Sequence, residues 1–200
     1  MVLFTGKGDD GTTKLFDSGR ASKDGARHDS AESGKRASKA SPIFECLGML
    51  DELNTLVGWC KAGCPDDLVA QERSVRIILH DVQDHLFTLQ AEVAGAAKSI
   101  PLSSVEAMGV FIGRVESEMP PIKTFLVPGA TELSARLDIA RAVARRAERR
   151  LVTLHESGER RVSEPSRAYA NRLSSLLYAL TRLVNHRTGV VENPPAYRDV

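Results

Sequence analysis

The chain has 200 residues, and its 27 basic and 26 acidic side chains give a formal net charge of only +1 at pH 7. This length suits a single domain over residues 1–200 with a substantial core. The balanced charge and the lack of any run of 18 apolar residues argue against nucleic acid or a membrane as partner, and the N-terminus has no signal-peptide pattern. We therefore expect a cytoplasmic protein.

The first element is a glycine-rich loop, TGKGDDGTT, at residues 5–13. Gly6, Gly8 and Gly11 satisfy the pattern G-x-G-x-x-G, in which the backbone can approach a pyrophosphate. A dinucleotide fold needs a strand before this loop and a helix after it, and the flanking sequence predicts neither. A Walker A loop is also excluded, because Thr12 stands where its lysine must be. The local sequence alone favours an Asp-Asp-Gly turn.

Residues 17–41 contain no large apolar side chain, so this segment cannot bury enough surface to order itself. Within it, SGRASK at residues 18–23 is echoed by SGKRASK at residues 33–39. We interpret one copy as an insertion. Residues 1–41 are thus predicted to form a flexible N-terminal segment.

Five amphipathic helices are predicted after this segment from apolar residues spaced three and four apart. They run from residue 43 to Gly63, from 66 to 97, from 103 or 104 to the residue before Pro120, from 131 to about 158, and from 163 to about 188. Strand patterns are essentially absent. Short connections between long helices predict an all-α, up-and-down five-helix bundle over residues 42–188, with residues 189–200 as a tail.

The fourth predicted helix carries RAVARRAERR at residues 141–150, with five arginines in ten residues. At about 100° per residue, Arg141, Arg145 and Arg149 form a stripe beside the apolar face. These stacked positive charges repel each other unless an anion or carboxylates lie opposite. Asp51 on the first helix is one candidate carboxylate, and Glu148 lies where it could orient the guanidinium of Arg145.

Three further features surround this stripe. Arg146 and Arg150 are typical of a solvated basic face. The apolar stretch FLVPG at residues 125–129 directly precedes the arginine-rich helix. Asn171 is polar within an otherwise apolar fifth helix, where an asparagine can be structural or functional.

No metal site is predicted. His80 and His85 are five residues apart, which places them on different faces of a helix. Cys46, Cys60 and Cys64 are odd in number and form no C-x-x-C pair, which fits a reducing compartment. We predict that the cysteines are packing residues.

Five blocks in this order resemble the PduO-type ATP:cob(I)alamin adenosyltransferases. The blocks are TGKGDDGTT, GKRASK, LGMLDELNTLVG, FLVPG followed by ARAVARRAERR, and NRLSSLLYALTRLVN, and together they cover most of the chain. The resemblance implies transfer of the 5′-deoxyadenosyl group of ATP to Co(I) of a corrinoid, with adenosylcobalamin and triphosphate as products. Two alternatives are a non-catalytic, ATP-gated corrinoid carrier or sensor of the same fold, and a helical-bundle interaction protein with an acidic partner.

The resemblance also implies a nucleotide site in two parts. Its N-terminal contacts are Thr5, Gly6, Lys7, Gly8 and Thr13. Its C-terminal residues are Arg145, Arg146, Ala147, Glu148, Arg149 and Asn171. A further contact is the lysine that closes the GKRASK element. Two lysines, Lys23 and Lys39, compete for this role, and Lys39 fits the spacing to the first helix better. Residues 17–33 are then the insertion.

For the corrinoid and the assembly, the resemblance implies two further roles. Phe125 matches an aromatic residue that displaces the lower axial ligand of the corrinoid, and with Arg145 it is a candidate catalytic residue. Asp51 and Arg141 match an ion pair between two subunits of a homotrimer. We also expect Mg²⁺ as cofactor and a reductase that supplies the electron for Co(II). An adenosylcobalamin-dependent enzyme is the expected recipient of the product.

Overall fold

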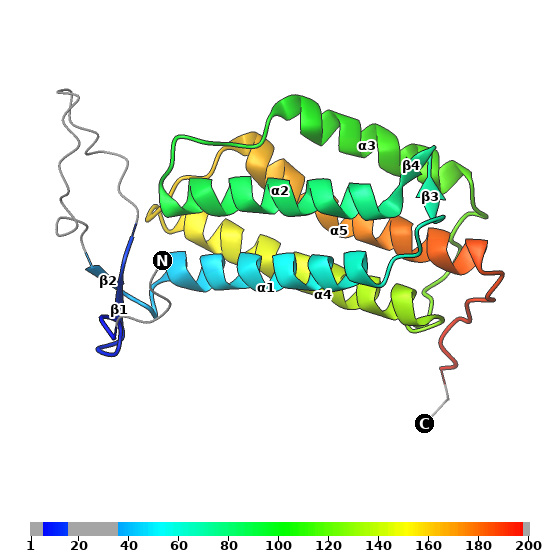
Figure 1. The fold of residues 1–200 in the computed structure, drawn as a ribbon, viewed down its shortest axis with the longest axis horizontal. Coiled ribbons are helices and arrows are strands. Elements are labelled where there is room, and N and C mark those ends of the chain that lie inside the picture. Colours follow the sequence, from blue (N-terminus) through cyan, green and yellow to red (C-terminus); the bar gives the residue numbers. More distant parts are fainter. Residues whose placement is uncertain (1–5, 16–35, 198–200) are drawn as a thin grey trace.

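The structure, a computed structural model, describes residues 6–15 and 36–197. Thr5, Lys23 and the predicted insertion at residues 17–33 lie outside the described residues. The helices are α1 Pro42–Ala62, α2 Val75–Ala94, α3 Leu102–Ser117, α4 Glu132–Glu156 and α5 Glu164–Arg187. They run alternately up and down along one common direction (Figure 1). The predicted five-helix bundle is confirmed.

The predicted start of the second helix is wrong. Residues 69–74 form a hairpin in which β3, Val69–Ala70, pairs antiparallel with β4, Arg73–Ser74, and α2 begins only at Val75. Gln71 and Glu72 connect the two strands with φ angles of 48° and 62°. Two consecutive residues with positive φ are typical of a tight hairpin turn, which usually contains glycine or asparagine. Because this turn contains neither, no local pattern predicts it.

A second hairpin corrects the expectation that strands are absent. β1, Thr12–Lys14, pairs antiparallel with β2, Arg36–Ser38, and places Thr13 opposite Ala37. The hairpin stands beside the end of the bundle at which α1 begins (Figure 1). It thereby joins the glycine-rich loop to the GKRASK element.

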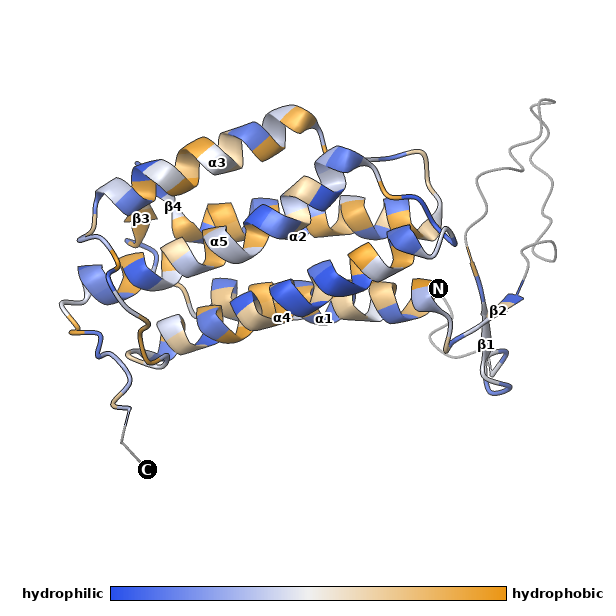
Figure 2. Ribbon diagram, turned by 180° about the vertical axis from the view of Figure 1, so that it is seen from behind, coloured by the Kyte–Doolittle hydropathy of each residue, from blue (hydrophilic) through white to orange (hydrophobic). Residues whose placement is uncertain are grey.

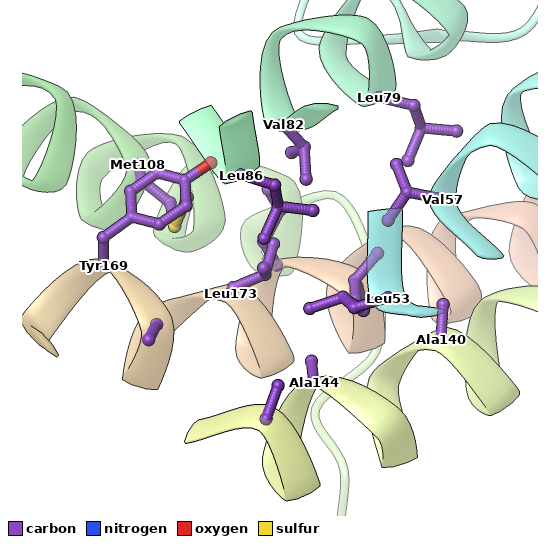
Figure 3. Packing of buried hydrophobic residues seen from close by; sticks show 14 of the residues in the cluster. Leu53, Val57, Leu79, Val82, Leu86, Met108, Ala140, Ala144, Tyr169 and Leu173 are labelled. Carbon is purple, nitrogen blue, oxygen red and sulfur yellow. The ribbon is translucent and has the colours of Figure 1, made fainter. Parts of the chain in front are cut away.

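The core lies between the helices, with α4 packed against α1 and α5, α2 against α1, and α3 against α5. Leu53 of α1, Leu86 of α2 and Leu173 of α5 point into it (Figure 3). On its buried side α4 contributes small residues, among them Ala140 and Ala144. Small side chains let neighbouring helix backbones approach closely. α4 therefore packs closely against both α1 and α5.

The two helices that carry most predicted site residues have well-defined starts. α4 begins with a capping box, in which Thr131 and Ser134 each bond the other's backbone N–H. At the start of α5, the buried carboxylate of Glu92 accepts hydrogen bonds from the Ser163 backbone N–H, at 2.7 Å, and from the Ser166 hydroxyl. None of the described helices is long and apolar enough to cross a membrane.

The cysteines are buried and unpaired, which confirms that they are packing residues. Burial raises the pKa of Cys46 to about 12 and that of Cys60 to about 11, and it also raises the pKa of Cys64. A raised pKa keeps a thiol protonated at pH 8, and the thiolate is the reactive form. We therefore expect a chromogenic disulfide reagent to label no cysteine in the native protein and all three in denaturant. Rapid labelling of the native protein would contradict this burial.

Candidate active site

The glycine-rich loop is a turn organised by Asp10. Its carboxylate accepts hydrogen bonds from the backbone N–H of Thr12, at 2.9 Å, and from the Thr12 hydroxyl, at 2.8 Å. These bonds lower the pKa of the Asp10 carboxyl group, the backbone bond having the largest effect. Gly6 and Gly11 have φ angles of 65° and 76°, a region that favours glycine. The prediction of a local turn is confirmed.

Arg36 of β2 clamps this turn, a role that the sequence interpretation missed. Its Nε donates to the Thr12 hydroxyl at 2.6 Å, and its Nη2 lies 3.1 Å from the Asp10 carboxylate and 3.0 Å from the Thr12 carbonyl. Nη2 also donates to the carbonyl of Lys7. The sequence alone could not predict these contacts, because they depend on the β1–β2 register, in which residue 36 lies opposite residue 14.

Lys39 lies on the same loop. Its Nζ donates to the carbonyl of Gly8 at 2.8 Å, and a Cβ added at Gly8 would lie 3.0 Å from that Nζ. Two of the predicted nucleotide contacts, Lys39 and Gly8, are therefore neighbours in space although they are 31 residues apart.

The arginine stripe on α4 is confirmed in position, but its partners differ from those expected. Arg141 pairs within its own helix, where its Nε lies 2.9 Å from Asp138, rather than with Asp51. The Nη1 of Arg149 donates to the backbone carbonyl of Arg145 at 3.0 Å. Within residues 6–15 and 36–197, the exposed side chain of Arg145 forms no hydrogen bond or ion pair. It is therefore free to meet a ligand.

The other two arginines of α4 connect it to α1. Arg146 lies 2.7 Å from Glu52, and Arg150 lies 3.2 Å from Glu45, with all four side chains near half exposed. Hydrophilic bands follow the visible side of α4 (Figure 2). This arrangement confirms that Arg146 and Arg150 belong to a solvated face.

Glu148 does not orient Arg145 as expected. Its carboxylate instead accepts a hydrogen bond from the Asn171 side-chain amide at 2.7 Å. This bond joins α4 to α5 and brings together two residues that were predicted for the nucleotide site. The geometry of a single helix could not show it, because the donor comes from a neighbouring helix.

A cavity of about 750 Å³ lies beside the α3–α4 loop. Residues 122–128 line one side of it; apart from Lys123 and Thr124 they are apolar, and we call them its apolar wall. Phe125 in this wall is 79% exposed. Arg141 and Arg145 line it from α4, and Tyr178 from α5. The Cζ atom of Arg141 lies 5.7 Å from the centre of the Tyr178 ring, within the range of a cation–π contact. Phe125 and Arg145, the two candidate catalytic residues, therefore share one cavity.

Several lining residues were missed in the sequence. They are Ser174, Ser175, Tyr178, Thr181, Asn185 and Glu192. The signal for those on α5 is a stripe that continues from Asn171 at helical spacing. Glu192 follows the helix and gave no comparable signal.

Arg145 also borders a second, shallower depression of about 400 Å³, formed with Glu148, Arg149, Val152 and Thr153. It is thus the residue that connects the apolar-walled cavity to the arginine face of α4. Across the described segments, the glycine-rich loop makes no hydrogen bond or ion pair with α4 or α5. The two predicted halves of the nucleotide site are therefore not joined by such contacts within one chain.

These features define an antiparallel five-helix bundle with an arginine-bearing helix beside an apolar-walled cavity. The sequence profile of the family described as "Cobalamin adenosyltransferase" matches residues 28–184. The chain belongs to this family.

Two relatives illustrate the similarity. The "Corrinoid adenosyltransferase PduO" of Citrobacter freundii is 35% identical over 193 residues, which are 93% of this chain and 50% of the relative. The "Corrinoid adenosyltransferase" of Bacillus subtilis is 33% identical over 199 residues, which are 95% of this chain and 90% of the relative. The chain thus spans about half the length of the PduO relative.

Solved structures show the same fold. An arginine-to-lysine variant of a PduO-type ATP:co(I)rrinoid adenosyltransferase from Lactobacillus reuteri, complexed with ATP, has a TM-score of 0.76 at 25% identity and covers 98% of this chain and 100% of its own. A phenylalanine-to-histidine variant, complexed with cobalamin and ATP, has a TM-score of 0.79 at 23% identity and covers 99% and 97%.

Proposed function

We propose that this chain transfers the 5′-deoxyadenosyl group of ATP to Co(I) of a corrinoid, forming adenosylcobalamin and releasing triphosphate. The observation that carries the proposal is the position of Arg145. Its unpaired guanidinium borders both the apolar-walled cavity, which suits a corrinoid, and the arginine face of α4, which suits a triphosphate. Membership of the family supplies the class of reaction.

The proposed reaction needs no catalytic base from the protein. The electron pair of Co(I) forms the bond to the 5′ carbon, and the bond between this carbon and the triphosphate oxygen breaks, so the oxygen leaves with its electron pair. The protein must neutralise the charge that gathers on the triphosphate. Arg145 and Arg149 are placed for this task on α4, and Lys7 and Lys39 would hold the phosphates from the N-terminal side.

Phe125 is proposed to act on the other substrate. A Co(II) corrinoid is easier to reduce once its lower axial ligand has left, and an apolar wall favours this state because it offers no ligand atom. The high exposure of Phe125, together with the exposed Ile122 and Val127 beside it, gives the loop an apolar surface for this contact.

Mg²⁺ is proposed to accompany ATP. It usually needs only one or two protein carboxylates when it is bound to substrate phosphates. The described part of the chain contains no group of three His, Cys, Asp or Glu residues that could hold a metal. Glu148 and Asn171 offer side-chain oxygens beside the arginine face, and the ion would add to the neutralisation of the triphosphate.

We further propose a homotrimer in which a second copy completes the nucleotide site, because among the described residues the two halves of that site make no hydrogen bond or ion pair with each other. Asp51 is exposed and lies in a shallow groove with Phe44, Leu47 and Phe87. In the proposed trimer, Asp51 pairs with Arg141 of the neighbouring subunit, beside the Asp138 that already holds this arginine.

Replacing Asp51 by alanine is therefore expected to remove the trimer. If the pair is buried between subunits, the loss of one partner leaves the other charge unpaired, at a cost of about 3–5 kcal/mol. Sedimentation velocity at micromolar concentration measures the assembly, with Asp67→Ala, in an exposed turn, as control. An intact trimer in the Asp51 variant would rule out this pair.

The activity is tested anaerobically with purified protein, MgATP and chemically reduced cob(I)alamin, by following the cobalt absorbance as the Co–C bond forms. The proposal expects rapid, ATP-dependent conversion. Tight, ATP-dependent binding of the corrinoid without conversion would favour the carrier, and failure to bind ATP would favour an interaction protein. As an enzyme, it would work in the cytoplasm with a reductase for Co(II) and an adenosylcobalamin-dependent enzyme as recipient.

A further inference from the structure

The chain beyond α5 returns to the Phe125 loop. Gly189 follows α5 with a φ angle of 67°, and the carbonyl of Asn193 then accepts a hydrogen bond from the backbone N–H of Val127 at 2.9 Å. The C-terminal segment leaves α5 at the end of the bundle at which α4 begins (Figure 1). Residues 190–197, here called the strap, therefore contact the apolar wall of the cavity.

Glu192 anchors the strap to α5. One of its carboxylate oxygens accepts from Arg182 Nε at 2.5 Å, and the other accepts from the Asn185 side-chain amide at 2.9 Å. The side chains of Arg182 and Glu192 are only 12% and 14% exposed, and Asn185 is buried. Both oxygens of this carboxylate are thus used in a place with little water, where charge-assisted hydrogen bonds are strong.

The anchor reaches the Phe125 loop at two points. Val127 is bonded by the residue after Glu192, and the Thr131 hydroxyl, at the N-cap of α4, lies 3.4 Å from the side-chain oxygen of Asn185. The loop between these points has little packing of its own, since Phe125 is largely exposed. Its position therefore depends on bonds from outside the loop.

We propose that Glu192 is a positioning residue, which holds the strap so that the Phe125 loop forms a fixed wall of the cavity. Glu192 and Asn185 line the same cavity as Phe125. This inference rests on the proposed function, because the purpose of a fixed wall is to face the corrinoid. The strap itself, however, can be tested without any corrinoid.

The first test is amide hydrogen exchange of the ligand-free protein, with Val127 as the reporter. In Glu192→Ala, exchange at Val127 is expected to rise about tenfold or more, since a net hydrogen bond contributes on that order to a local opening equilibrium. Glu45→Ala is the matched control. It removes an exposed pair with Arg150 at the start of α1, at the end of the bundle away from the strap (Figure 1), and should not change exchange at Val127. Unchanged protection in Glu192→Ala would overturn the strap.

The second test follows cob(II)alamin bound with MgATP, whose absorbance spectrum reports the loss of the lower ligand. Glu192→Ala is expected to lower the fraction of bound cob(II)alamin that lacks its lower axial ligand, as Phe125→Ala does. The double variant should show no further loss. Transfer from preformed cob(I)alamin should stay within about threefold of wild type, because the phosphate-binding arginines are untouched. Equal losses in both assays would indicate a general structural role and overturn the positioning role.

Two further variants keep this test decisive. Glu192→Gln keeps the shape and one acceptor oxygen, so it should retain most of the wild-type spectrum. Deletion of residues 190–200 removes the strap without altering any residue of the bundle, so it tests the proposal even if Glu192→Ala folds poorly. The truncated chain should show the same change in Val127 exchange and in the cob(II)alamin spectrum as expected for Glu192→Ala. Wild-type behaviour of the truncated chain would also overturn the proposal. If the wild type binds no corrinoid, the proposed function fails, while the exchange experiment still decides whether the strap exists.

Discussion

Arg145→Ala is expected to slow adenosyl transfer from preformed cob(I)alamin at least about a hundredfold, because the loss of one preorganised donor typically costs about 3 kcal/mol. Arg145 is the stripe arginine whose side chain has no partner in the described part of the chain. Its charge is therefore available to the leaving triphosphate. The effect should fall mainly on kcat, since this charge develops in the transition state.

Arg150→Ala is the matched control. It removes an arginine of the same helix whose exposed pair with Glu45 has little energetic weight, so activity should remain within about twofold of wild type. Initial rates over a range of ATP concentrations separate kcat from KM. Near-normal turnover of Arg145→Ala would contradict the assignment of this residue.

The second large effect is expected for Phe125→Ala. With preformed cob(I)alamin the variant should remain active, whereas with cob(II)alamin and a reductant it should be slowed by a much larger factor. The reason is that the smaller side chain admits water or the lower ligand to the cobalt, which makes Co(II) harder to reduce. The two assays are compared at the same MgATP concentration.

Two variants define this effect. Phe125→Leu keeps an apolar side chain and should retain most of the reductive activity. Val110→Ala removes an exposed apolar group on α3, outside the cavity, and should change neither assay. Equal losses of Phe125→Ala in both assays would count against a role in removing the lower ligand.

The bundle was predictable because its helices carry apolar residues at regular spacing over long stretches. The wrong predictions concern segments in which rules based on neighbouring residues give no signal. The turn at Gln71 and Glu72 contains no glycine, and the strands β1 and β2 are only three residues long and mostly polar. Their pairing depends on contacts between distant parts of the chain.

The site was predictable in part. Resemblance and helical geometry placed Phe125 and Arg145, which the structure brings to one cavity. The partner of Glu148 could not be derived, because it comes from α5. Glu192 was missed for a similar reason, since a single glutamate in a tail without helical or strand pattern becomes informative only when the tail is seen to fold back onto Arg182.

The bond between Lys39 and the Gly8 carbonyl has a consequence for how tightly a nucleotide can bind. A free surface lysine loses about 0.5–1.5 kcal/mol of side-chain freedom when a ligand immobilises it. Lys39 has already given up part of that freedom on folding, because a neutral carbonyl holds its ammonium group beside the loop. An arriving phosphate would exchange this neutral acceptor for a charged one, so more of the resulting attraction would remain as affinity for ATP.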